Sequence, residues 1–124
     1  MSDMDIVPPK PALTPAAFHI LLALAQRELH GYEIMKEASK LSGGSLRLAP
    51  GTLYRSIKDL LRAGWIEESD ERPDPELDDE RRRYYRLTAL GRRVARAETL
   101  RMAALVAIAA RRKLVRGRIQ EAPG

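Results

Sequence analysis

The sequence predicts a mainly α fold with one small β-hairpin, an α+β arrangement, on three observations. Apolar residues recur at helical spacing in three short stretches of the first half of the chain. Two stretches that suit strands follow, on either side of an acidic segment with two prolines. One long, apolar-rich stretch comes last. The expected order is helix, helix, helix, strand, long loop, strand, long helix.

The first helix is expected from Thr14 to about Arg27. Threonine suits an N-cap, and Pro15 suits the first helical position, where its missing N–H costs nothing. Residues 1–13 contain three prolines and few apolar side chains, so we expect a flexible N-terminal arm.

A break at His30-Gly31 precedes the second helix, which we expect from about Tyr32 to Leu41. Ser42-Gly43-Gly44 then ends it, because glycine tolerates the left-handed backbone that closes many helices. Residues 45–48 are interpreted as one short strand.

The third helix is expected to open at Pro50 and to end at Gly64. It is amphipathic. Its apolar face holds Leu53, Ile57, Leu60 and Leu61. The opposite face holds Thr52, Arg55, Lys58 and Arg62, with Tyr54 on the flank and one acid, Asp59.

Trp65-Ile66 begins the first hairpin strand and Arg82 to Leu87 forms the returning one, with the acidic loop between them. Thr88 is expected to cap a last helix that runs to about Arg116. The predicted organisation is therefore a head at 14–87, a helix at 88–116 and a frayed C-terminus at 117–124.

Composition excludes several classes of protein. The chain has 124 residues, 44% hydrophobic and 31% charged, which suits one globular domain. There is no cysteine, so disulfides and thiolate chemistry are excluded. The N-terminus lacks the pattern of a signal peptide, and the longest apolar run, 102–110, is too short to cross a bilayer. We expect a cytoplasmic protein with no membrane partner.

Charge is unevenly distributed along the chain. Residues 67–80 hold nine acids and one arginine, a net charge of −8. The rest holds 21 bases and eight acids, so it carries +13. A basic body suits a polyanion such as DNA, although a well-solvated surface would have the same composition.

The last helix indicates a dimer. Leu90, Val94 and Ala97 form one face, which Leu105 and Ile108 continue. From Met102 to Ala110 the helix is apolar on every side. Such a helix must be covered on every side, and a second copy covers it better than a small head can.

Three short helices and a hairpin are the layout of a winged helix-turn-helix domain, whose third helix enters the DNA major groove. The chain also resembles the PadR family of transcriptional regulators over about residues 13–116. The resemblance rests on residues 13–24, 30–34 (HGYEI), 50–54 (PGTLY), 60–66 (LLRAGWI) and 83–91 (RYYRLTALG). It is to the short form of that family, with a single C-terminal dimerisation helix.

The resemblance implies a dimeric repressor that binds double-stranded DNA and that a small hydrophobic effector releases from the DNA. No cofactor is implied. Tyr32 would reach the DNA backbone, and Gly51, Thr52 and Tyr54 would form the leading turn of the recognition helix. Arg55 and Lys58 would enter or flank the groove. Dimerisation would use Leu90, Val94, Leu105 and Ile108.

The hairpin departs from the family pattern, because Asp78-Asp79-Glu80 stands where a basic or glycine-rich tip is usual. The resemblance places Arg81, Arg82 and Arg83 at the basic entrance of the wing. Two interpretations stay open for them: contact with phosphate, or neutralisation of the neighbouring acids. An acidic tip is not expected to enter a groove.

No nucleophile–base pair, phosphate loop or paired-carboxylate site is found, so an enzyme is not expected. His19 and His30 lack a ligand set around them, and a metal site is not expected either. Two rivals stay open. One is a winged-helix module that binds proteins without binding DNA. The other is a different winged-helix family such as MarR, which usually needs a helix where the proline-rich residues 1–13 stand.

Overall fold

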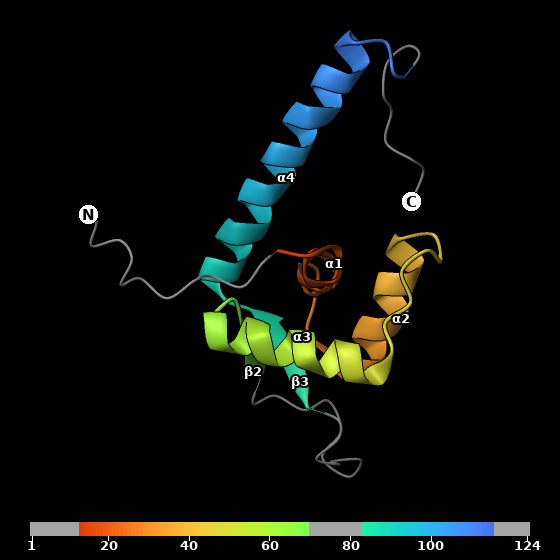
Figure 1. The fold of residues 1–124 in the computed structure, drawn as a ribbon. Helices are drawn as coiled ribbons and strands as arrows, with labels where there is room; N and C mark the ends of the chain where they lie inside the picture. The colour runs from red at the N-terminus through yellow and green to blue at the C-terminus, as the bar shows by residue number, and fades with distance from the viewer. Residues whose placement is uncertain (1–12, 70–82, 116–124) are drawn as a thin grey trace, which may run out of the picture.

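The computed structural model describes residues 13–69 and 83–115. The helices are α1 Pro15–Leu24, α2 Gly31–Leu41, α3 Pro50–Ala63 and α4 Ala89–Arg111. The strands β1 Leu29–His30, β2 Ile66–Ser69 and β3 Tyr84–Leu87 form an antiparallel sheet in the order β1-β3-β2. In Figure 1, α1–α3 gather over the small sheet and α4 projects away from them. This arrangement confirms the predicted mainly α, winged-helix fold with a long last helix.

Local signals at the helix starts explain where three of the helices begin. The Thr14 hydroxyl accepts from the Ala17 N–H at 3.0 Å, and Pro15 takes the first turn of α1. Thr88 caps α4 in the same way, through the Gly91 N–H at 2.9 Å. His30 caps α2, and Glu33 returns a bond to the His30 N–H at 3.1 Å. His30, predicted only as part of a break between helices, thus forms a capping box with Glu33.

The strand prediction for residues 45–48 is wrong. This segment is irregular, and Leu48 is buried in the core without pairing. The third strand is Leu29–His30, which pairs with Tyr84 and Tyr85 of β3. Two residues are too few to show strand periodicity, so their pairing depends on the distant partner.

Two helices end earlier than expected. The first helix ends at Leu24, not near Arg27. The last ends at Arg111, not near Arg116, because Lys113 adopts a φ of 63°. Leu114 and Lys113 then donate to the carbonyls of Ala109 and Ala110, both at 3.0 Å. This double bond pattern is the Schellman motif that closes helices.

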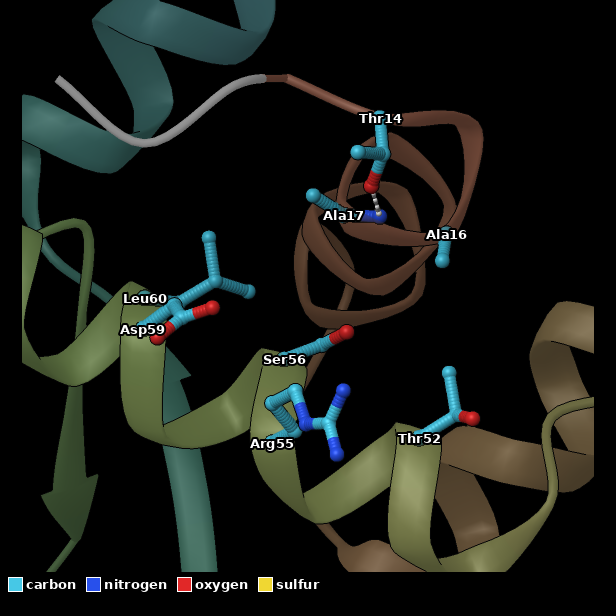
Figure 2. Close-up of a pocket in the computed structure, with 8 residues that line it drawn as sticks. All are labelled: Thr14, Ala16, Ala17, Thr52, Arg55, Ser56, Asp59 and Leu60. Carbon is cyan, nitrogen blue, oxygen red and sulfur yellow. Dashed lines mark hydrogen bonds between the residues drawn. The ribbon is translucent and has the colours of Figure 1, made fainter.

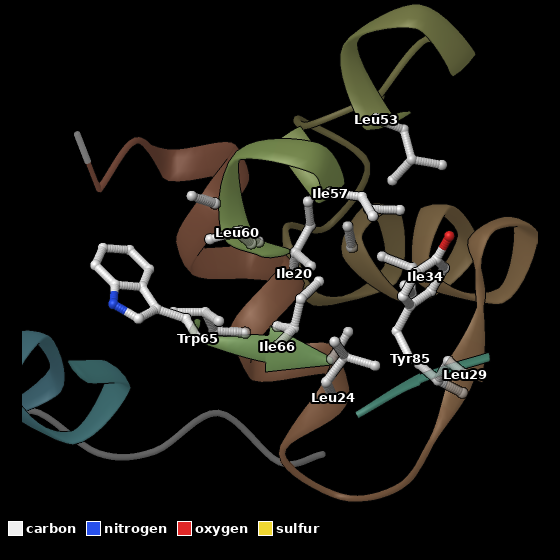
Figure 3. Packing of buried hydrophobic residues seen from close by; sticks show 14 of the residues in the cluster. Ile20, Leu24, Leu29, Ile34, Leu53, Ile57, Leu60, Trp65, Ile66 and Tyr85 are labelled. Atoms are coloured by element: carbon white, nitrogen blue, oxygen red, sulfur yellow. The ribbon is translucent and has the colours of Figure 1, made fainter. Parts of the chain in front are cut away.

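The core lies between α1, α2, α3 and the sheet. Figure 3 shows the buried side chains directed into one interior. Ile20 and Leu21 of α1 and Ile34 of α2 are fully buried, and Leu53 and Leu60 of α3 are 1% exposed. Gly64 closes α3 with a φ of 77°, and Trp65 is buried directly after it. The apolar face predicted for the third helix is therefore its core face.

No helix within residues 13–69 and 83–115 combines the length and hydropathy needed to span a membrane.

Candidate nucleic-acid interface

The outward face of α3 is basic. Leu53, Ile57 and Leu60 fix the orientation of the helix by pointing into the core. The opposite side leaves the predicted residues Gly51, Thr52, Arg55 and Lys58 exposed, together with Arg62. Within the described part of the chain, neither Arg55, Lys58 nor Arg62 forms an ion pair or a side-chain hydrogen bond. Their positive charges are thus not neutralised inside this part of the molecule.

The leading turn of α3 is open. Ala49 stands at the N-cap and makes no side-chain hydrogen bond, and Pro50 follows it. A Cβ atom added at Gly51 would have no neighbour within 4 Å. Gly51 thus leaves open space beside the first turn of α3, at the positive end of the helix dipole.

Two tyrosines flank this turn. Tyr54 is 47% exposed, and its ring packs against the backbone of Gly31 at the start of α2. A Cβ at position 31 would lie 2.7 Å from the Tyr54 hydroxyl oxygen, so a glycine is required while that ring stays in place. Tyr32 is 59% exposed, with the Lys36 ammonium 5.5 Å from its ring centroid. The contact of Gly31 with Tyr54 therefore brings the start of α2, where Tyr32 lies, against the first turns of α3.

The arginines of the hairpin differ from those of α3. Arg83 pairs with Glu68 at 3.7 Å. Arg86 lies between Glu67, at 3.0 Å, and Glu28, at 3.5 Å, and its hydrogen bond to Glu67 raises the pKa of its guanidinium. Arg83 thus has an ionic partner across the sheet, which is compatible with either interpretation of the hairpin arginines. Arg81, Arg82 and the acidic tip 78–80 lie outside the described residues.

The two tyrosines of β3 face different surroundings. Tyr85 is 7% exposed and packs in the core, where burial raises the pKa of its phenol, assisted by Glu68 and Tyr54. Tyr84 is half-buried and meets the His30 ring edge to face, with centroids 5.3 Å apart. His30 is therefore part of the packing between β1 and β3.

A family model decides which regulator family this fold belongs to. The model of the transcriptional regulator PadR-like family matches residues 20–97, from α1 into α4. The chain belongs to the PadR-like family. No curated protein sequence matches it significantly.

Solved structures similar to this PadR-like chain share its fold. A transcriptional regulator from Clostridium thermocellum is 22% identical with a TM-score of 0.63, over 77% of this chain and 87% of that one. A PadR family regulator from Clostridium difficile is also 22% identical, with a TM-score of 0.62, over 79% and 97%. Bacillus subtilis PadR in complex with operator DNA is 20% identical with a TM-score of 0.57, over 91% and 54%.

The last helix of this PadR-like chain carries a large exposed apolar surface. Of the predicted dimerisation residues, Leu90, Leu105 and Ile108 are 41%, 52% and 37% exposed. Val94 differs, because it is half-buried against the core of its own chain. Leu100 and Val106 of α4 are also exposed, at 57% and 44%. Beyond its second turn, α4 is therefore left uncovered by the described head.

A groove of about 410 Å³ lies between the first turn of α1 and the outer flank of α3. Figure 2 shows Thr14, Ala16 and Ala17 on one side and Thr52, Arg55, Ser56, Asp59 and Leu60 on the other. Sequence reasoning missed it, because it depends on how α1 and α3 are placed relative to each other. Arg55 thus lines a groove whose apolar wall includes Ala16, Ala17 and Leu60.

The ring of His19 makes a contact within its own helix. The His19 ring nitrogen Nδ1 lies 2.7 Å from the carbonyl oxygen of Pro15, four residues earlier on α1. Among the described residues, no group of three or more histidines and carboxylates is placed to hold a metal ion.

Proposed function

We propose that this chain binds double-stranded DNA through α3, as a sequence-specific transcriptional regulator. The observation that carries the proposal is the face of α3 on which Arg55, Lys58 and Arg62 have no ionic partner in the described chain. A helix of this size fits the major groove, and arginine and lysine are the side chains that most often read guanine there. Membership of a family of transcriptional regulators supports the same function.

The leading turn of α3 suits contact with the DNA backbone. The lack of a side chain at Gly51 lets a phosphate approach the exposed N–H groups, where the helix dipole favours negative charge. Thr52 lies exposed in this turn, and Tyr32 is exposed next to Gly31, which contacts Tyr54. Both offer hydroxyl groups to phosphate oxygens. We assign Gly51, Thr52 and Tyr32 to backbone contact, and Arg55 and Lys58 to the groove.

We further propose that two copies pair through α4. The exposed leucines, valine and isoleucine of this helix would be covered by the same helix of a second chain. A two-fold dimer would set two α3 helices about one turn of DNA apart, roughly 34–36 Å. Leu90, Leu105 and Ile108 would form the interface, with a smaller part for the half-buried Val94.

Repression is the mode of regulation that we propose, with release by a small hydrophobic effector. The groove between α1 and α3 supports the second part, since its apolar wall adjoins Arg55. An effector seated there would compete with DNA for the same arginine. The test uses a strain in which the promoter that this chain binds drives a reporter. Deleting the gene for this chain should raise reporter expression, and lower expression would contradict repression.

Binding to DNA is tested by fluorescence anisotropy with two labelled duplexes. One carries the DNA upstream of the chain's own gene, and the other is its scrambled counterpart. We expect tighter binding to the first and a steep loss of affinity with salt on both. Arg55→Ala/Lys58→Ala should cost about 1–3 kcal/mol for each base contact on the first duplex, with less effect on the second.

The control is Arg111→Ala/Arg112→Ala, which removes the same charge at the far end of α4. It should keep wild-type preference for the upstream duplex. Equal binding by the α3 variant and wild type would overturn the assignment of α3. Absence of salt-dependent binding to either duplex would favour a module that binds proteins.

A further inference from the structure

The start of α4 packs against α1 and β3, and it meets the end of α3 at only a few of the described residues. Figure 1 shows the C-terminal end of α3 beside the first turn of α4. The two buried residues of α4, Gly91 and Ala95, lie in its first two turns. The rest of the helix projects beyond the head, so small changes at this end are amplified along α4.

Thr88 makes bonds to both helices at this point. Its hydroxyl donates to the carbonyl of Gly64, the residue that closes α3, at 2.6 Å. The same oxygen accepts from the Gly91 N–H in the first turn of α4 at 2.9 Å. The Thr88 N–H donates to the carbonyl of Trp65 at 3.1 Å. One residue thus ties the last residue of the recognition helix to the first turn of the helix that leaves the head.

The backbones also approach closely here. A Cβ atom at Gly91 would lie 1.8 Å from the carbonyl oxygen of Trp65, so only glycine fits. Trp65 is itself held by a bond from its N–H to the carbonyl of Leu60, at 3.1 Å, and by burial in the core. The start of α4 therefore rests directly on the backbone of Trp65, which follows the C-cap of α3.

We propose that Thr88 is a positioning residue that fixes the angle between α3 and α4, and thereby the spacing of the two DNA half-sites. This inference rests on the proposed function, because it needs the α4 dimer and DNA reading by α3. In such a dimer α4 is shared between the two heads, so its angle to each α3 sets their separation. One inserted base pair moves a half-site by about 3.4 Å and turns it by roughly 35°.

Substitutions at position 88 separate the two bonds of the hydroxyl. Thr88→Ser keeps both. Thr88→Asp keeps the cap of α4, since aspartate is a good N-cap, but an ionised carboxylate cannot donate to Gly64. Because the cap survives, Thr88→Asp should remain a folded dimer with intact α3. It should lose the hydroxyl bond to Gly64, while the backbone bond from the Thr88 N–H to Trp65 and the contact at Gly91 remain.

The experiment selects binding sites from a duplex library with roughly 40 random base pairs, enough for two half-sites one or two turns apart. Wild type and Thr88→Ser should recover the same half-site at one spacing. Thr88→Asp should recover the same half-site at several spacings. A one-base-pair insertion in the selected site should then cost wild type at least about tenfold in affinity and Thr88→Asp less than about threefold.

Two results would overturn the proposal. One is a Thr88→Asp protein that selects the single wild-type spacing. The other is a folded Thr88→Asp dimer that selects a changed half-site, which would mean that Thr88 acts within the head. Sedimentation of each variant establishes that it is dimeric. If wild type itself enriches no sequence, or only isolated half-sites, the proposed function fails instead.

Discussion

The head of the molecule and the outer part of α4 bury their apolar residues to very different extents. In the head, Ile20, Leu21 and Ile34 are completely buried, and Leu29, Leu53 and Leu60 are 1% exposed. In α4, Leu100 and Leu105 remain 57% and 52% exposed. Both regions are rich in apolar side chains, yet only the head covers them within one chain. The head thus has its own core, whereas α4 leaves apolar surface exposed, which the proposed second copy would cover.

The largest expected effect comes from placing charge on the outer part of α4. Leu105→Glu/Ile108→Glu would bury two unpaired carboxylates in the proposed interface, which costs more than the remaining contacts offset. The variant should sediment as a monomer and lose binding to the selected duplex, with an unchanged head. Leu114→Glu is the control, because Leu114 lies beyond α4 and is 77% exposed. If wild type sediments as a monomer at micromolar concentration, the exposed apolar surface of α4 does not pair two chains and the contrast with the head fails.

A smaller effect tests whether the packing of the head is internal to one chain. Gly31→Ala places a Cβ 2.7 Å from the Tyr54 hydroxyl oxygen and displaces the ring. Overpacking of this kind costs about 1–3 kcal/mol. In a Tyr54→Ala background the clash is absent, so Gly31→Ala should be neutral or slightly stabilising, because alanine favours a helix.

Urea unfolding of wild type, the two single variants and the Gly31→Ala/Tyr54→Ala double variant measures the coupling between positions 31 and 54. Repeating it in the Leu105→Glu/Ile108→Glu background shows whether the coupling needs a second chain. We expect the same coupling in monomer and dimer. Additive effects of the two substitutions would mean that Tyr54 does not rest on Gly31 in solution.

Local signals explain what the sequence could predict in both regions. As helix caps, Thr14, Thr88 and Gly64 bond to backbone groups within a few residues, so the helix ends that depend on them were placed well. The strand at Leu29–His30 depends on pairing with β3 more than fifty residues later, and periodicity cannot reveal it. The groove beside Arg55 and the fit of Gly31 to Tyr54 likewise depend on how separate helices pack.

In the candidate site too, features set by local spacing could be predicted and features set by packing could not. The basic face of α3 follows from helical spacing alone, so Arg55 and Lys58 were found exposed as predicted. The contact of Arg83 with Glu68 depends on the pairing of β2 with β3, so sequence spacing could not predict it. For the same reason, sequence spacing gave no sign that Val94 packs partly against its own head.

The acidic segment between β2 and β3 is expected to have little effect on DNA affinity. If its tip stays away from DNA, removing residues 74–79 should leave affinity unchanged or raise it modestly, because negative charge that repels the phosphates at long range is lost. The anisotropy assay above measures this, with thermal unfolding as the control for folding. A large loss of affinity in a folded deletion would place the segment at the DNA.

The smallest expected effect concerns alkaline stability of the head. Burial raises the pKa of Tyr85 above its ordinary value of 10.0, with further contributions from Glu68 and Tyr54. Its neutral form is therefore favoured in the folded state. The stability that this contributes is fully present below about pH 10 and is lost as pH rises through the folded pKa.

Tyr85→Phe has no proton to lose, so its melting temperature should fall less steeply than that of wild type above pH 10. Near pH 7 the two proteins should differ only slightly, because both bury an aromatic ring at this position. Melting curves at half-unit steps from pH 7 to 11 provide the comparison. The same pH slope above pH 10 in both proteins would show that Tyr85 ionises as readily in the folded chain as in the unfolded one. In that case the head would be less closed around β3 than its burial indicates, and the contrast with α4 would be weaker.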